Sequence, residues 1–100
     1  MERVLTLADC LLDPTREQWE RMHAAQDLDE CGPDALPYLF EATSLDWSHD
    51  PAMLKLIGNS IANIWRDAGI LKTASTDGLP QATVDEIAMH RAHMGGEGTL

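Results

Sequence analysis

The stretch at residues 50–65, DPAMLKLIGNSIANIW, constrains the fold more than any other part of the chain. Its apolar side chains recur at steps of three and four residues, the period of a helix with one buried face: Leu54, Ile57, Ile61, Ile64 and Ala68. Asp50 and Pro51 supply a cap and a first-turn proline, and Gly69 supplies a left-handed stop. The pattern predicts a helix over residues 51–68.

A glycine inside this helix needs a reason, because it costs about 1 kcal/mol relative to alanine. Gly58 and Ala62 lie four residues apart and share a face, where they leave a shallow groove. We expect a helix over residues 33–44 to approach this groove as the antiparallel partner in a helical hairpin. Asn59 and Asn63 project from another side, as either a solvated face or a hydrogen-bonding surface.

The rest of the chain is also predicted to be helical, because no segment shows the alternating β-branched pattern of strands. We predict an all-α fold of about five helices in one domain, residues 1–100. The helices span residues 3–12, 15–27, 33–44, 51–68 and 83–94, with an irregular segment over 72–82 and a frayed tail over 95–100. Two helix starts have the spacing of a capping box: Thr15 with Gln18, and Thr83 with Glu86.

The three tryptophans have different expected places. Trp19 shares a side of its helix with Met22, and Trp65 flanks the apolar stripe of residues 51–68, so both are predicted in the core. Trp47 sits in a short polar loop. There it either folds back onto the hairpin or is displayed as an interface anchor.

The net charge of −10 is unevenly distributed. Residues 1–50 carry twelve acidic side chains against three arginines, a net charge of −9, and residues 51–100 carry −1. Such a field repels nucleic acid and anionic membranes and attracts a basic protein partner, although acidity also simply keeps a protein dissolved. We therefore expect no nucleic-acid or membrane binding.

The expected location is the cytoplasm. Charged residues interrupt the apolar start of the chain, unlike an export signal, and no apolar run has the length of a membrane span. The chain has two cysteines, Cys10 and Cys31. We expect them to be two thiols in a reducing compartment and not one disulfide.

Few side chains have the spacing of a catalytic or metal site, and phosphate-loop, Cys-x-x-Cys and His-Glu-x-x-His motifs are missing. Glu86, His90 and His93 share a side of the last predicted helix and have ligand types that suit zinc or iron. A second helix is usually needed to complete such a site, so a polar helix face explains them better. We expect no enzyme activity, no metal and no cofactor.

The loop residues Asp46, His49 and Asp50 surround Trp47 and form a possible acid–base group. Capping of the following helix explains His49 and Asp50 better.

Residues 35–65, ALPYLFEATSLDWSHDPAMLKLIGNSIANIW, resemble one HEAT repeat, a helical hairpin of a superhelical array. The resemblance lies in the leucine-proline-x-leucine of Leu36–Leu39, the Asp50-Pro51 pair, and the mixture of apolar and small residues that follows. The basic residue usual after the Asp-Pro pair is shifted to Lys55. Residues 3–28 are similar to a looser preceding repeat. The resemblance implies a HEAT-like stack of about two and a half hairpins, in which neighbouring units bury each other's faces.

HEAT-like proteins bind partners along their second helices, and a small acidic chain of this kind is also similar to immunity proteins of bacterial toxin systems. The resemblance implies a monomeric immunity protein that neutralises a basic, nuclease-type toxin domain. The alternative is a HEAT-like scaffold or adaptor subunit of a larger complex. Candidate partner-binding residues lie in the acidic linker, the loop and the clearest helix: Asp27, Asp29, Glu30, Asp34, Asp46, Trp47, Asp50, Asn59, Asn63 and Arg66.

Overall fold

The computed structural model describes the backbone of residues 2–98 and the side chains of residues 2–93. Within that range the chain forms five α-helices, one short 3₁₀ helix and no strand, which confirms the all-α prediction. The elements are α1 (Glu2–Leu12), α2 (Gln18–Asp29), η1 (Gly32–Ala35), α3 (Leu36–Thr43), α4 (Ala52–Asp67) and α5 (Gln81–Gly98). None of these described helices is both long and apolar enough to cross a membrane.

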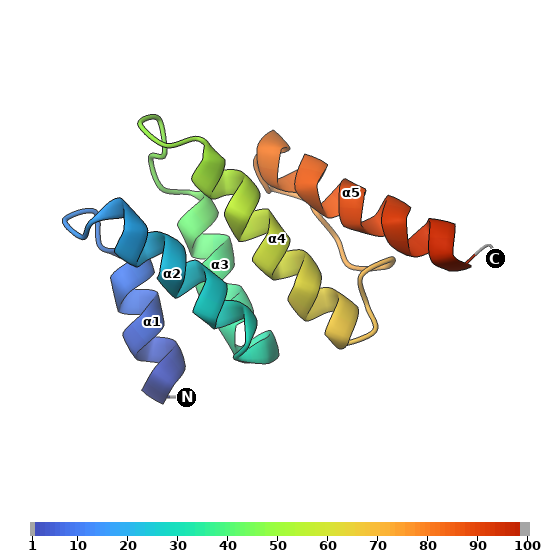
Figure 1. Ribbon diagram of the computed structural model, residues 1–100, viewed down its shortest axis with the longest axis horizontal. Helices are drawn as coiled ribbons and strands as arrows, with labels where there is room; N and C mark the ends of the chain where they lie inside the picture. Colours follow the sequence, from blue (N-terminus) through green and yellow to red (C-terminus); the bar gives the residue numbers. More distant parts are fainter. Residues whose placement is uncertain (1, 99–100) are drawn as a thin grey trace.

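The helices are arranged as two stacked hairpins and a closing helix (Figure 1). α1 pairs with α2 and α3 with α4, while α2 packs on α4 and α1 on α3. α5 covers the opposite side of α4 and points in the same general direction as α2 and α4. The segment of residues 68–80 leads back from the end of α4 to the start of α5, and its Ser75 and Leu79 share a hollow with Phe40 and Thr43 of α3.

Helix α4 lies at the centre of the fold and supplies much of the core. Its buried apolar side chains include Met53, Ile57, Ile61, Ile64 and Trp65. The core position of Trp65 is therefore confirmed, as is the predicted apolar stripe at Ile57, Ile61 and Ile64, whereas Leu54 is only partly buried and Ala68 is exposed. At its C-terminal end, Gly69 has a φ of +77°, and the N–H groups of Gly69 and Ile70 donate to the carbonyls of Arg66 and Trp65. This pair of hydrogen bonds forms a Schellman motif, which ends the helix as the glycine at position 69 predicts.

Gly58 is buried as expected, but the helix that approaches it is α5 and not the segment 33–44. A Cβ atom added at Gly58 would lie 2.9 Å from the Thr83 carbonyl oxygen and 3.1 Å from the Glu86 Cβ. Thr83 does not cap α5, which begins two residues earlier. Instead its buried hydroxyl donates to the Leu54 carbonyl at 2.8 Å. The small-residue groove predicts a close helix without identifying which one.

The buried face of α2 also differs from the prediction. Its buried residues are Arg21, Ala24, Ala25 and Leu28, and the side chain of Trp19 is 61% exposed. Two alanines let α2 come close enough to α4 for the Ser60 hydroxyl to donate to the Ala25 carbonyl at 2.9 Å. The sequence argument chose the face with the largest apolar side chains, whereas the packing uses the face with the smallest.

The starts of α2 and α3 are shifted as well. α2 begins with a capping box of Glu17 and Glu20 in place of Thr15 and Gln18, and Thr15 bonds instead to the Asp13 carboxylate. The predicted helix 33–44 is divided into η1 and α3, with a proline in the first turn of each.

The irregular segment before α5 is packed against the fold. Leu71 is buried, and the Arg91 guanidinium donates to the carbonyls of Leu71, at 2.8 Å, and Ala74. The backbone of α5 continues to Gly98, past the predicted end near residue 94. Of the predicted tail over 95–100, residues 99–100 lie outside the described part of the chain.

Candidate functional site

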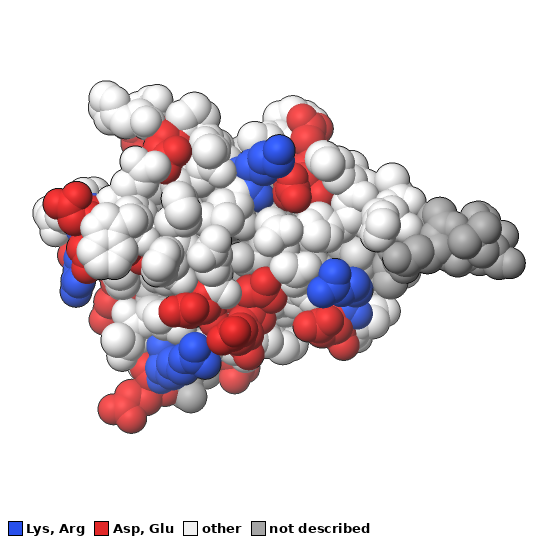
Figure 2. Space-filling view, viewed as in Figure 1, with Lys and Arg blue, Asp and Glu red and all other residues white. Residues whose placement is uncertain are grey.

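The structure gathers part of the predicted acidic set at one end of the molecule. Asp29 and Glu30, at the end of α2, meet Asp67, at the end of α4, around a hollow of about 340 Å³ with Ile64 and Pro33 in its wall. We call this hollow, lined by Asp29, Glu30, Gly32, Pro33, Ile64, Asp67 and Ala68, the acidic pocket. Figure 2 shows acidic side chains gathered over this end of α2 and the neighbouring part of α4.

The carboxylates of the acidic pocket make few and mostly solvent-exposed interactions with the rest of the protein. Asn63 donates to Asp29 at 2.7 Å and so fixes one carboxylate across the α2–α4 contact. Glu30 pairs with Arg3 at 3.3 Å and Asp67 with Arg66 at 3.6 Å, and all four side chains are half exposed or more. Exposed pairs of this kind contribute about 0–1 kcal/mol, so a stronger cation can displace them.

Asp67 is a residue that sequence reasoning missed, whereas Asp27 and Asp34 are exposed residues beyond the lining of the acidic pocket. The register of α4 contained the signal for Asp67, since it lies on the same side as Asn63 and Ile64, one turn earlier. Arg66, predicted to contact a partner, is exposed beside Asp67.

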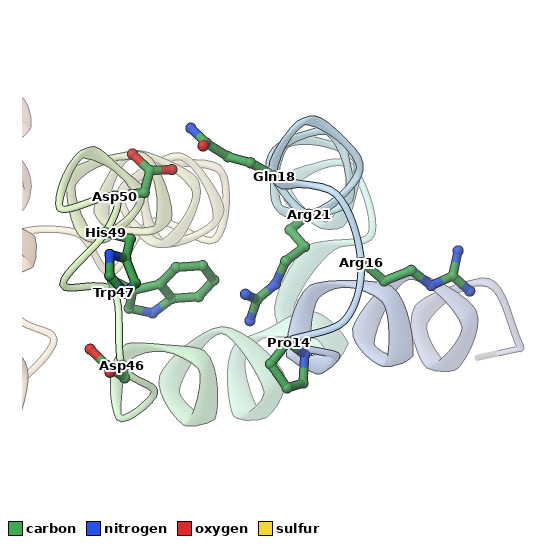
Figure 3. A pocket seen from close by; sticks show the side chains of 8 residues that line it. All are labelled: Pro14, Arg16, Gln18, Arg21, Asp46, Trp47, His49 and Asp50. Carbon is green, nitrogen blue, oxygen red and sulfur yellow. The ribbon is translucent and has the colours of Figure 1, made fainter.

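The loop residues form a second hollow, of about 370 Å³, at the opposite end of α2. We call it the loop pocket; its lining consists of Pro14, Arg16, Gln18, Arg21, Asp46, Trp47, His49 and Asp50 (Figure 3). It lies where the α1–α2 connection meets the α3–α4 connection. Sequence reasoning missed Arg21, which entered it only as one of the three arginines in the charge count of residues 1–50.

Arg21 and Trp47 join the two connections. The Arg21 guanidinium lies 4.1 Å above the centroid of the Trp47 ring, and its Nε–H donates to the Leu11 carbonyl at 2.9 Å. The Trp47 indole N–H donates to the Ala42 carbonyl at 2.7 Å. Trp47 is only 7% exposed, so of the two alternatives the folded-back position is correct, and Trp47 is not displayed as an interface anchor.

The two aspartates of the loop pocket differ in their surroundings. The backbone N–H and the side chain of Ser48 bond to Asp46 and hold the pKa of its carboxyl below the ordinary value. Asp50 does not cap α4 through its side chain, and its buried Oδ2 atom has no hydrogen-bond partner among the described residues. Asp46, His49 and Asp50 thus line one hollow, and the preferred explanation of Asp50, that its side chain caps α4, is wrong.

Asn59 is also engaged inside the molecule, at the contact between α4 and α5. The His90 Nε2 atom lies 2.8 Å from its Oδ1 atom and 3.4 Å from the Glu86 carboxylate. Glu86 and His90 are largely buried, whereas His93 is exposed. Among the described residues, no group of three or more histidine, cysteine or acidic side chains is placed to hold a metal ion.

Comparison with known proteins adds no relative to this picture. No family model, curated protein or solved structure matches the chain.

Proposed function

We propose that this chain is an acidic protein-binding module that holds a basic protein partner, and that it acts as an immunity protein against a toxin domain in the cytoplasm. The observation that carries the proposal is the convergence of Asp29, Glu30 and Asp67 on one hollow that no basic residue lines. The HEAT-like resemblance and the free thiols of Cys10 and Cys31 are consistent with this assignment.

The acidic pocket suits a lysine or arginine side chain. Pro33 and Ala68 offer apolar surface to the methylene stem, and the three carboxylates surround the charged head. The net charge of −10 extends this attraction beyond the pocket. A basic partner would therefore be steered toward the molecule over several ångströms, at a rate that falls steeply with salt.

An adaptor subunit is the alternative, and it requires a continuous apolar surface. Among residues 2–93, whose side chains the structure describes, the large exposed apolar side chains are Leu5, Trp19, Ile70 and Met89, which belong to four different segments of the chain. Single apolar residues scattered in this way are ordinary on protein surfaces. The acidic pocket is the more specific feature, so the inhibitor is the function we propose.

The test uses the protein encoded by the adjacent gene as the candidate toxin. Its toxic domain is expressed with and without this chain while growth is followed, and the affinity of the purified pair is measured by calorimetry at two salt concentrations. We expect growth to be restored and the affinity to fall as salt rises. Failure to bind and to protect would contradict the proposal.

A charge-matched pair of variants isolates the acidic pocket. The triple variant Asp29→Asn, Glu30→Gln, Asp67→Asn removes its three charges, and the new amide at position 29 keeps an oxygen to accept from Asn63. The control variant Glu2→Gln, Asp9→Asn, Asp77→Asn removes three exposed charges elsewhere. We expect the first to weaken binding about tenfold or more, roughly 1.4 kcal/mol, and the second much less. Equal losses in both would mean that only net charge matters.

A further inference from the structure

The Arg21 side chain is buried in an unusual state for a charged group. It is only 9% exposed, yet its hydrogen bond to the Leu11 carbonyl uses Nε alone. Over the described residues, no hydrogen bond or ion pair reaches its two terminal nitrogens. The buried, unpartnered side-chain atoms among the described residues do not include these two nitrogens, so both are open to the space beside them, where an anionic acceptor can reach them.

The loop pocket is the space that these nitrogens face. Figure 3 shows the Arg21 guanidinium pointing between Trp47 and Pro14, while Arg16 points away from the pocket toward the solvent. Arg16 is already paired with Glu20, at 3.1 Å, and with Asp13. The stacked indole and the Leu11 carbonyl hold the Arg21 guanidinium in one orientation, so little rotational freedom remains to be lost on binding.

The charged residues around the loop pocket restrict the chemical class of ligand that it can bind. Asp46 is bonded to Ser48, and Figure 3 shows Asp50 and Gln18 pointing toward one another at another rim of the pocket. A dianion such as phosphate would be repelled by both aspartates and by the net charge of −10. A metal cation would be repelled by Arg21. A single carboxylate matches the single planar guanidinium in charge and shape.

We propose that the loop pocket is a carboxylate-binding site, in which the terminal nitrogens of Arg21 receive the carboxylate. Its volume of about 370 Å³ admits a small organic acid or one acidic side chain of a peptide. The site is independent of the acidic pocket and of the function proposed for it, because it lies at the other end of α2 and takes a ligand of opposite charge.

The experiment follows the Trp47 indole N–H and the Arg21 Nε–H by NMR during titration of the whole protein. One arm uses acetate, and the other a capped tripeptide with a central glutamate. Phosphate and chloride at equal ionic strength, acetamide and the glutamine peptide are controls. We expect saturable shifts with the carboxylates alone, with dissociation constants of about 1–10 mM. Tighter binding of the peptide would assign the site to a polypeptide, and tighter binding of acetate to a free acid.

Variants separate the site from general charge effects. Arg21→Gln should abolish the saturable shift, whereas Lys72→Gln, an exposed change of equal charge, should leave it unchanged. Asp50→Asn should tighten carboxylate binding severalfold by removing a repelling charge, which provides a second test if Arg21→Gln does not fold. The proposal is overturned if the wild type shows no saturable shift with either carboxylate, or if phosphate binds equally well.

Discussion

The close contact between α4 and α5 makes Gly58→Ala an informative substitution. In an ordinary helix this change is favourable by about 1 kcal/mol. Here the new methyl group would lie 2.9 Å from the Thr83 carbonyl oxygen and 3.2 Å from the Thr83 Cα. Both atoms belong to the backbone, so they can yield only if α5 moves away from α4.

The expected cost follows from what this movement disturbs. Overpacking a close contact costs about 1–3 kcal/mol. The shift also stretches two bonds that join the helices, Thr83 to Leu54 and His90 to Asn59, each 2.8 Å long and worth about 1 kcal/mol. After the gain in helix propensity is subtracted, we expect a net loss of about 2 kcal/mol, which lowers the melting temperature by roughly 10 °C in a chain of this size.

Urea unfolding followed by circular dichroism measures this loss. Ala88→Gly, at an exposed position in α5, serves as the control for helix propensity and should cost about 1 kcal/mol. Hydrogen exchange should show faster exchange in α5 of Gly58→Ala and little change in α1. A variant that is more stable than the wild type would refute the argument, because it would mean that α5 does not approach Gly58 closely.

Three further predictions test other contacts. Arg91→Met should leave the two carbonyls of the 68–80 segment without the guanidinium that binds them and destabilise the protein by about 1–3 kcal/mol. Tryptic cleavage at Lys72 should then become faster, and unchanged cleavage would count against the anchoring role of Arg91. Ser60→Ala should cost about 1 kcal/mol in urea unfolding, since it removes the buried bond between α4 and α2, and a neutral result would argue against that bond. Hydrogen bonds from Thr15 and from Ser48 lower the pKa values of Asp13 and Asp46, respectively. The stability that these hydrogen bonds add is therefore present above about pH 4 and is lost as the pH falls through the lowered pKa values. A urea midpoint that rises on acidification would contradict this.

Much of the helical pattern could be predicted from the sequence because it depends on local signals. The apolar period of α4 and the glycine at position 69 act within a few residues, and both predictions are confirmed. The end of α2 at Asp29 and the start of α5 at Gln81 each fall within two residues of the predicted positions.

The errors concern contacts between distant segments. Thr83 has the spacing of a cap, but α5 begins two residues earlier and the Thr83 hydroxyl donates to the Leu54 carbonyl of α4. Trp19 is exposed instead of buried, because periodicity cannot show that an alanine face packs in preference to an aromatic one. Nor could it decide between the two alternatives for Trp47, of which the structure shows the folded-back one. For the same reason periodicity did not predict the burial of Arg21, although Arg21 lies three and four residues before the buried Ala24 and Ala25.

Of the predicted site, Asp29 and Glu30 do line one hollow, and Asn63 bonds to Asp29 beside it. The stacking of α2 on α4 brings Asp67 beside them, and the helix face that Asp67 shares with Asn63 was the one signal in the sequence for it. Trp47 and Asn59 turned out to be committed to intramolecular bonds.

The most direct test of the account is the hydrogen-exchange footprint of the basic partner on this protein. We predict that binding slows exchange at the end of α2, in η1 and in the last turn of α4, around Asp29, Glu30 and Asp67, and that the triple variant lacking these charges loses this protection. Protection confined to α1 or α5, with the amides around the acidic pocket unchanged, would contradict it.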